Sequence, residues 1–250
     1  MNKNLIYEIV VFGATSDIAQ SYLIKRYETL SKEYNYININ FIGRNKDQLN
    51  ILKEKYSNKF NNINLFETDF KVISDKLINY LENFSFDEVL IAQGQLTDQN
   101  KSLNEINYIK EDLNINLLSH IIIINSAIEK INQQQRGKLI ILGSVAGDLG
   151  KKSNFTYSYT KAAIQNYVEG VQHKNPDLEI YLIKPGLTKT KMTKHLNQNS
   201  LLWSKPEKIA KDIDNAIKNK KLLIYSPWWW KYIMLFLKLL PKFVFQKIKI

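Results

Sequence analysis

The stretch "FGATSDIAQ", residues 12–20, joins an apolar run to a helical pattern through a short turn. The run "LIYEIVVF" (5–12) is typical of a buried strand, and residues 17–33 of a helix capped by Ser16 or Asp17. A dinucleotide-binding turn ordinarily carries three glycines, but this stretch offers only Gly13. The stretch therefore predicts either a cofactor loop or a simple strand-to-helix turn.

Strand-like and helical patterns alternate along the rest of the chain. Further strands are predicted over 36–43, 63–70, 87–94, 138–144, 178–186 and 221–227, and helices over 47–57, 75–84, 109–134, 156–172 and 204–220. The last helix opens with Ser204-x-x-Glu207, the pattern of a capping box, and with Pro206 in its first turn. The alternation predicts an α/β fold with a Rossmann-like doubly wound parallel sheet between two helical layers. We expect one domain over 1–226 and an amphipathic helical tail over 227–250.

The composition excludes several functional classes. The absence of cysteine excludes disulfides and thiolate metal sites, and His120, His173 and His195 lack the spacing of metal ligands, so no metal is expected. The N-terminus does not resemble a signal peptide, and we expect a cytoplasmic protein. The net charge of +11 is concentrated in one region, with eight lysines and no acidic residue over 215–250, which is unlike a nucleic-acid-binding surface.

Short motifs follow six of the predicted strands in turn. They are Gly13, Arg44, Asp69, "AQG" (92–94), Ser144 and "KPG" (184–186). Because ligands of such sheets bind at the carboxyl ends of the strands, we expect these motifs to lie together in one site.

The segment "YSYTK" (157–161) carries the clearest chemistry. Tyr157 and Lys161 lie four residues apart on a predicted helix and share one face. A lysine ammonium favours the phenolate, so we expect it to lower the pKa of Tyr157. Such a phenol can protonate a carbonyl oxygen as a hydride arrives, while the Ser144 hydroxyl polarises that oxygen. The alternative for an isolated pair is a packing tyrosine and a solvated lysine. Asn116 is unusual inside a helix, because asparagine has a poor helix propensity.

The order of these motifs resembles the short-chain dehydrogenase/reductase family over about residues 5–190. The resemblance implies a catalytic tetrad in which Tyr157 is the proton donor and Lys161 lowers its pKa and holds the nicotinamide ribose. It also implies that Ser144 positions the substrate carbonyl and that Asn116 anchors a water relay.

The same resemblance implies a nicotinamide cofactor at the first turn. The family pattern there is Gly-x-x-x-Gly-x-Gly, whereas Asp17 and Ala19 replace the second and third glycines in this chain. Because its charge would repel a pyrophosphate, we expect the Asp17 side chain to cap the turn and point away from the phosphates. "AQG" departs from the family's Asn-Ala-Gly turn at Ala92. The implied cofactor contacts are Gly13, Thr15, Ser16, Asp17, Ile18, Arg44, Asp69, Phe70, Ala92, Gln93, Gly94, Tyr157, Lys161, Pro185, Gly186, Thr188 and Thr190.

Three of these contacts define the expected cofactor. Asp69 matches the aspartate that binds adenine in the family, and Thr190 the threonine that touches the cofactor's amide or phosphate. Arg44 suits the 2′-phosphate of NADP, and no acidic residue that would suit NAD occurs over 43–46. We therefore expect NADP, with NAD as the alternative; an ordinary surface arginine is the other interpretation of Arg44.

The tail "PWWWKYIMLFLKLLPKFVFQKIKI" (227–250) is apolar, but lysines interrupt it and Pro241 breaks it. It falls short of the ~20 clean residues that span a bilayer. On a helical wheel, Lys231, Lys238, Lys242 and Lys249 form one stripe beside a broad apolar face. This pattern favours a helix in the membrane interface that meets anionic headgroups. The alternatives are a helix packed on the domain and a subunit interface.

Several segments resemble one branch of the family, which includes the decaprenylphosphoryl 2-keto-ribose reductases. They are "GATSDIA", "SVAGDLGKKSN", "KPGLTKTKMT", "LLWSKPE" and "YSPWWWKYIM". The resemblance implies reduction of a keto-sugar on a polyprenyl phosphate or similar carrier in polysaccharide or glycolipid biosynthesis. It also implies a flavoprotein oxidase that supplies the ketone, and a homodimer or homotetramer.

A polar lid over 189–203 would cover the sugar. Its lysines, Lys189, Lys191 and Lys194, either meet a phosphate or are simply solvated. Two alternatives remain for the whole chain. One is a soluble reductase of a sugar phosphate, nucleotide sugar or polyol, and the other is a catalytically silent NADP-binding sensor or scaffold.

Overall fold

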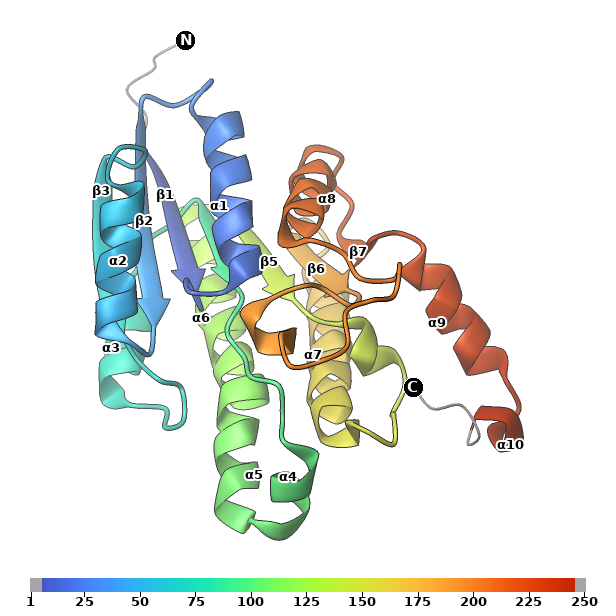
Figure 1. Cartoon of the computed structure of the whole chain (residues 1–250). Helices are drawn as coiled ribbons and strands as arrows, with labels where there is room; N and C mark the ends of the chain where they lie inside the picture. The colour runs from blue at the N-terminus through green and yellow to red at the C-terminus, as the bar shows by residue number, and fades with distance from the viewer. Residues whose placement is uncertain (1–5, 246–250) are drawn as a thin grey trace.

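The computed structural model describes residues 6–245, and it contains a seven-stranded sheet in the order β3-β2-β1-β4-β5-β6-β7 (Figure 1). All six neighbouring strand pairs are parallel, as predicted. The strands are β1 (Ile6–Phe12), β2 (Tyr36–Gly43), β3 (Asn62–Glu67), β4 (Glu88–Ile91), β5 (Lys138–Leu142), β6 (Glu179–Pro185) and β7 (Leu223–Ser226). The predicted Rossmann-like α/β fold is confirmed.

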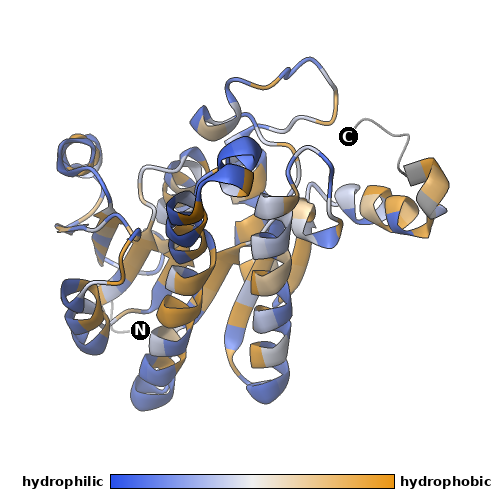
Figure 2. Ribbon diagram, turned by 90° about the horizontal axis from the view of Figure 1, so that it is seen from below, coloured by the Kyte–Doolittle hydropathy of each residue, from blue (hydrophilic) through white to orange (hydrophobic). Residues whose placement is uncertain are grey.

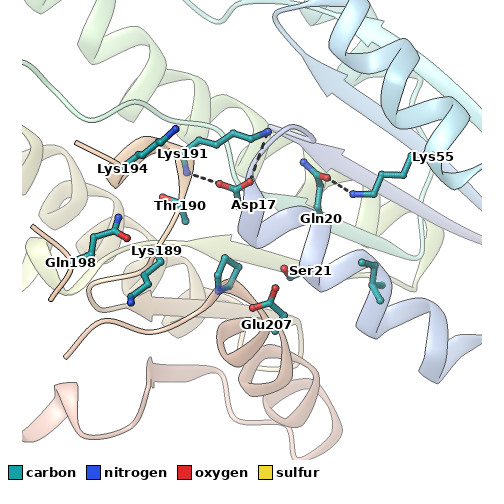
Figure 3. A pocket seen from close by; sticks show the side chains of 12 residues that line it. Asp17, Gln20, Ser21, Lys55, Lys189, Thr190, Lys191, Lys194, Gln198 and Glu207 are labelled. Atoms are coloured by element: carbon teal, nitrogen blue, oxygen red, sulfur yellow. Dashed lines mark hydrogen bonds and ion pairs between the residues drawn. The ribbon is translucent and has the colours of Figure 1, made fainter. Parts of the chain in front are cut away.

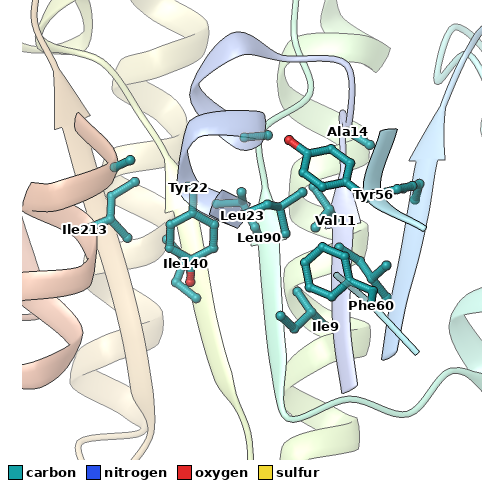
Figure 4. Close-up of a cluster of buried hydrophobic side chains, with 14 of the residues drawn as sticks. Ile9, Val11, Ala14, Tyr22, Leu23, Tyr56, Phe60, Leu90, Ile140 and Ile213 are labelled. Carbon is teal, nitrogen blue, oxygen red and sulfur yellow. The ribbon is translucent and has the colours of Figure 1, made fainter. Parts of the chain in front are cut away.

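Helices cover both faces of the sheet, because successive side chains of each buried strand point to opposite faces. In β1, Ile9 and Val11 face one helical layer, and Val10 and Phe12 face the other. The first layer, partly drawn in Figure 4, contains α1 (Asp17–Leu30), α2 (Lys46–Tyr56) and α8 (Pro206–Lys218). The second contains α3 (Asp75–Asn83), α6 (Ser119–Gln134) and α7 (Phe155–Lys174). Figure 2 shows the apolar residues gathered between these layers.

The segment after β4 differs from the single long helix predicted over 109–134. It consists of α4 (Gln99–Asn104), α5 (Ile106–Leu113), the π-helical segment η1 (Asn114–Leu118) and then α6. The strands predicted to reach Phe70 and Gly94 end earlier, at Glu67 and Ile91, and the backbone has a φ of +60° at Phe70 and of +150° at Gly94. The π-helical turn places Asn116 at an irregularity in the helix, which accounts for its poor fit to a regular helical pattern.

Two predicted helix boundaries are wrong. Helix α1 begins at Asp17 with Ser16 as its N-cap residue, as predicted, but it ends at Leu30 rather than at residue 33, and the Ser16 side chain makes no capping hydrogen bond. The predicted capping box of α8 does not form, because Lys205 is the N-cap residue. Ser204 instead pairs with Thr188 in an isolated parallel bridge, and its amide donates to the Leu187 carbonyl at 2.8 Å. Pro206 does occupy the first turn of α8.

The tail continues from β7 into α9 (Trp230–Leu239) and α10 (Lys242–Phe245). One stripe of α9 packs on the domain, where Trp230 and Met234 are buried against Val145 and Leu149. The opposite stripe is exposed, and Figure 2 shows α9 as a largely apolar helix. We call this stripe, with its continuation on α10, the exposed tail face: Trp228, Tyr232, Leu235, Phe236, Leu239 and Phe243.

The predicted lysine stripe is only partly described. Lys231 and Lys238 lie seven residues apart, between the buried stripe and the exposed tail face. Lys249 and the side chain of Lys242 lie outside the part that the structure describes. Within residues 6–245, no helix has the length and apolar character to cross a membrane.

Candidate active site

The turn between β1 and α1 requires Gly13. Its φ of +77° lies in the left-handed region, and a Cβ there would approach the Gln93 amide nitrogen to 2.5 Å. The amides of Gly13 and Ala14 both donate to the Ile42 carbonyl, at 2.9 and 3.0 Å. The turn thus lies against the end of β2 and the "AQG" loop after β4.

Asp17 adopts a different contact from the one predicted. Its carboxylate does not cap the turn but accepts a hydrogen bond from the Lys191 amide at 2.6 Å (Figure 3). The Lys191 ammonium also lies 3.9 Å from the other carboxylate oxygen. Lys191 begins the short 3-10 helix η3 (Lys191–Thr193), which therefore presents an unpaired first-turn amide to the anion. Asp17 ties the start of α1 to the lid.

A cavity of about 520 Å³ lies where α1, the lid and the start of α8 meet (Figure 3). Its wall is rich in lysine, although it also includes carboxylates. The lining residues are Asp17, Gln20, Ser21, Ile24, Lys55, Lys189, Thr190, Lys191, Lys194, Gln198, Pro206 and Glu207. The predicted catalytic residues are not among those that line this cavity, whereas two predicted cofactor contacts, Asp17 and Thr190, are.

Ser144, Tyr157 and Lys161 come together beside the end of β5. Asn154 caps α7 by accepting from the Tyr157 amide at 3.3 Å, so Tyr157 and Lys161 lie on the first two turns. The Lys161 ammonium lies 5.7 Å from the centre of the Tyr157 ring and donates to the Leu142 carbonyl at 3.3 Å. The Ser144 hydroxyl lies close enough to the Tyr157 phenol to favour its phenolate form, and it accepts from the Ala146 amide at 3.1 Å.

Burial dominates the acid–base character of this pair. It raises the pKa of Tyr157 to about 12, and the nearby Ser144 hydroxyl only partly opposes this shift. It also lowers the pKa of Lys161 to about 8, with the charge of Asp112 opposing the shift. The predicted lowering of the Tyr157 pKa is therefore wrong, because desolvation outweighs the favourable groups nearby. At neutral pH the phenol keeps its proton and Lys161 is mostly an ammonium.

Asn116 is fully buried, and its side chain holds the loop that follows "AQG". Its oxygen accepts from the Gln95 amide at 2.9 Å, and its nitrogen donates to the Gln95 carbonyl at 3.1 Å. The same nitrogen donates to Asp112 at 2.9 Å. A Cβ on Gly94 would lie 3.1 Å from the Asn116 oxygen and 3.9 Å from the Lys161 ammonium. The loop therefore runs directly between these two side chains.

Asp112 was not identified from the sequence. Its spacing from Asn116, four residues along a helix, is the one signal that connects the two residues.

His120 lies behind this loop with no exposed surface. Its two ring nitrogens and the Gln93 side-chain oxygen are buried without a hydrogen-bond partner in acceptable geometry among the described residues. Burial, aided by the charge of Lys161, holds the pKa of His120 well below its usual value, although the backbone of Gln93 and Ile115 lies close enough to oppose the shift. His120 is therefore a neutral group beside Lys161.

The other predicted cofactor contacts are arranged along the same edge of the sheet. Thr15, Ser16 and Ile18 are half-buried in the first turn, and Ala92 is half-buried in the "AQG" loop. Arg44 and Asp69 are exposed after β2 and β3, and Asp69 accepts from the Lys71 amide at 3.0 Å. Phe70 is buried against Phe12, with ring centres 6.4 Å apart.

The "KPG" segment lies under the tail rather than open to solvent. A Cβ on Gly186 would overlap the Trp230 indole, at 1.8 Å from its nitrogen, so only glycine fits there. Pro185 and Thr188 are buried, and the Thr188 hydroxyl donates to the Gly186 carbonyl at 3.0 Å. The Thr190 hydroxyl pairs with that of Thr193 at 3.2 Å.

A buried ion pair connects this segment to the Ser144 loop. Lys184 of β6 pairs with Asp148, and Tyr225 of β7 donates to Asp148 at 2.8 Å. Lys238 of the tail lies 4.0 Å from the same carboxylate. The tail, β6 and the loop after Ser144 are therefore held together by one carboxylate, a role that local sequence patterns do not reveal.

The described residues contain no group of three or more histidine, aspartate or glutamate side chains that could hold a metal ion. The Tyr157 phenol, the Ser144 hydroxyl and the Lys161 ammonium gather at this edge of the sheet.

Comparison with known proteins identifies the family. An uncharacterized oxidoreductase of Mycobacterium tuberculosis is 22% identical over 160 residues, which cover 63% of this chain and 64% of that protein, less than two thirds of its length. The structure of a short-chain dehydrogenase from Sphingobium yanoikuyae in complex with NADPH has a TM-score of 0.76 at 13% identity and covers 88% of both chains. The bulky-bulky ketone specific alcohol dehydrogenase from Comamonas testosteroni has a TM-score of 0.76 at 15% identity, covering 98% of this chain and 96% of its own.

At such identities the structural likenesses show the fold alone. The sequence model of the short chain dehydrogenase family, however, matches residues 10–201. Since this match spans more than half of the chain, the chain belongs to the short-chain dehydrogenase family.

Proposed function

We propose that the chain is an NADP-dependent reductase that converts the ketone of a carrier-linked keto-sugar to an alcohol. The observation that carries this proposal is the cluster of Ser144, Tyr157 and Lys161 at the carboxyl edge of the sheet, beside the Gly13 turn. A protonated phenol, a hydroxyl and an ammonium are the groups that such a reduction needs.

The residues present fit a nicotinamide cofactor. Gly13 and Gly94 have no side chains where the turn and the "AQG" loop meet, so a ligand can approach the backbone there. The backbone amides at the start of α1 can donate to a pyrophosphate. The exposed Arg44 after β2 suits a 2′-phosphate, which supports NADP over NAD. When bound, the reduced nicotinamide supplies the hydride.

Each member of the cluster has a defined role in this proposal. Ser144 holds the carbonyl oxygen, and Tyr157 donates its proton to that oxygen as the hydride reaches the carbon, so that the product is an alcohol. The Lys161 ammonium compensates the phenolate that forms. Asn116 keeps the loop over 94–97 in place beside Lys161.

Two surface features support a substrate on a lipid phosphate carrier. The lysine-rich cavity under the lid offers positive charge to a phosphate. The exposed tail face places apolar side chains beside Lys231 and Lys238, which suits a helix lying on an anionic membrane surface at its cytoplasmic side. A flavoprotein oxidase acting on the corresponding alcohol would supply the ketone.

The catalytic assignment is tested by NADPH oxidation with a panel of keto-sugars, free and lipid-linked, with NADH in parallel. We expect Tyr157→Phe to lower turnover by about 10²–10⁴-fold, because the proton donor is lost, and to retain NADPH binding. Tyr159→Phe is the matched control: Tyr159 lies on the same helix with 40% of its surface exposed, and the variant should keep full turnover. Unchanged turnover in Tyr157→Phe would exclude the proposed mechanism.

The membrane assignment is tested by sedimentation with vesicles that contain phosphatidylglycerol. We expect the wild type to bind them, and Leu235→Ser with Phe236→Ser to abolish binding. Ile51→Ser, which removes a 62% exposed apolar side chain from α2, is the control and should bind as the wild type does. Dimerisation that depends on Leu235 and Phe236, without vesicle binding, would show instead that the tail joins two subunits.

A further inference from the structure

Asp112, in the last turn of α5, is a buried carboxylate without a cationic partner. It has no exposed surface, and its oxygens accept from the Thr97 hydroxyl at 2.9 and 3.0 Å, the Gln95 amide side chain at 3.0 Å and Asn116 at 2.9 Å. No ion pair reaches it within residues 6–245. A buried carboxylate costs several kcal/mol unless a cation or hydrogen bonds compensate it. Only neutral donors compensate the Asp112 carboxylate. Because no cation cancels its negative charge, that charge acts on more distant groups.

The contacts of Asp112 fix a wall of the candidate active site. The Asn116 side chain is hydrogen-bonded to Asp112 and to both backbone groups of Gln95. The carboxylate therefore sets the position of the loop over 94–97. The Cβ position of Gly94, at the start of that loop, lies 3.9 Å from the Lys161 ammonium. Displacement of Asp112 would therefore move the backbone against which Lys161 lies.

The charge of Asp112 acts on the same pair of side chains. It raises the pKa of Lys161, against the effect of burial, and it also raises the pKa of Tyr157. The other groups that face this pair are the neutral His120 from α6 and the Ser144 hydroxyl after β5. Among the described groups that shift the pKa of Lys161 or Tyr157, Asp112 is the one that carries a negative charge.

We propose that Asp112 is a positioning residue for the reduction: it fixes Asn116 and the loop over 94–97 beside Lys161, and it supplies the negative charge at this wall of the site. This inference rests on the proposed function of Tyr157 and Lys161. It assigns to a carboxylate outside the expected tetrad the task of holding Asn116 in place and of favouring the ammonium form of Lys161.

The test is the pH dependence of kcat/KM for NADPH-dependent reduction in Asp112→Asn, which removes the charge and preserves the shape. Reduction needs protonated Tyr157 and charged Lys161, so activity is lost as pH rises through the lower of their two pKa values, about 8 for Lys161. The neutral side chain lowers both pKa values. We expect the alkaline limb to move to lower pH by about one unit.

Thr97→Val is the matched control, because it removes a hydrogen bond to the carboxylate and keeps the charge. We expect it to lower the melting temperature while the alkaline limb stays at the wild-type pH. Asp112→Ser provides a second neutral variant, and NADPH binding and melting temperature are measured for each. An unmoved limb in a folded neutral variant, or the failure of both neutral variants to fold, would overturn the assignment and leave Asp112 with a structural role.

The two proposals fail separately. If Tyr157→Phe loses turnover while the limb of Asp112→Asn is unmoved, the positioning role alone is wrong. If Tyr157→Phe keeps full turnover, the proposed function is wrong whatever Asp112→Asn shows.

Discussion

Strand β4 has a buried carboxylate cluster at each end, and the two clusters balance their charge differently. At the amino end, Glu88 pairs with Arg26 at 2.7 Å and Asp214 pairs with the same guanidinium at 3.3 Å. At the carboxyl end, Asp112 accepts hydrogen bonds only from the neutral groups of Thr97, Gln95 and Asn116. In the first cluster cations pair with both carboxylates, since Lys218 also lies 2.8 Å from Asp214. In the second cluster no cation pairs with the carboxylate among the described residues, so its charge acts on the surrounding groups.

The positions of the clusters explain the difference. The amino end lies away from the edge at which ligands of a parallel sheet bind, and there Arg26 joins α1, β4 and α8. The carboxyl end borders Tyr157 and Lys161, where a compensating cation beside Asp112 would cancel the field that the pair experiences. We infer that charge pairing at the amino end of β4 stabilises the fold. At the carboxyl end, the unpaired charge of Asp112 acts on the proposed catalytic residues.

Removal of the cation at the amino end should have the largest effect on stability. Arg26→Leu leaves Glu88 and Asp214 buried without the guanidinium, and we expect a loss of about 3–5 kcal/mol in the free energy of unfolding by urea. Lys25→Leu, on the same helix but in an exposed pair with Glu28, is the control and should leave the free energy of unfolding close to the wild-type value. Turnover per folded molecule should be unchanged in both variants.

A loss below about 1 kcal/mol in Arg26→Leu would show that the amino-end cluster does not stabilise the fold, and the contrast between the two ends would disappear.

The sequence was sufficient for features that depend on local patterns. Apolar runs predicted the seven strands, and strand-end motifs predicted that Gly13, Ser144, Tyr157 and Lys161 would gather at one edge. The sequence was insufficient for polar groups whose hydrogen-bond partners come from distant parts of the chain. Asp112 lies in "IKEDLN", a pattern typical of a solvated helix, and its burial depends on Gln95 and Thr97 folding back over it.

The effect of desolvation on pKa values could not be predicted from the sequence either. The spacing of Tyr157 and Lys161 predicted their shared face, but the direction of the pKa shift of Tyr157 depends on how deeply both are buried. The contact between Asp17 and Lys191 joins residues 174 positions apart, and the parallel bridge of Ser204 replaces a local cap. In each case a tertiary contact outweighed a local preference.

The carboxyl end should also be the pH-sensitive end of the strand, because His120 is buried there without a compensating anion. Its pKa is held well below that of the unfolded chain, so the unfolded state binds the extra proton as pH falls below about 6.5. Wild-type stability should then fall by up to about 1.4 kcal/mol per pH unit from this residue. We expect His120→Leu to lose that contribution, which urea unfolding at pH 7, 6 and 5 would measure.

The control for this prediction is His173→Leu, which changes an exposed histidine near the end of α7 and should keep the wild-type pH dependence. Equal pH dependence in His120→Leu and the wild type would mean that His120 gains a proton in the folded state, and that the carboxyl end tolerates a further charge.

Asp17 allows a finer test of charge at the carboxyl edge, with the smallest expected effect. Its carboxylate lies at the start of α1, where the helix dipole favours it but its charge opposes a phosphate bound at the same helix end. Unlike Asp112, it is partly exposed and also holds the lid through the Lys191 amide. Charge and lid contact can be separated by two substitutions at this one position.

Asp17→Asn keeps an oxygen for the Lys191 amide and removes the charge, whereas Asp17→Gly removes both. We expect both variants to bind NADPH about two- to fivefold more tightly, since a dipole-scale interaction of about 0.3–1 kcal/mol is no longer in competition with the phosphates. Only Asp17→Gly should speed tryptic cleavage after Lys191, because only it releases the lid. Weaker NADPH binding by Asp17→Asn would show that the carboxylate assists the cofactor. The charge of Asp17, like that of Asp112, would then serve the site directly.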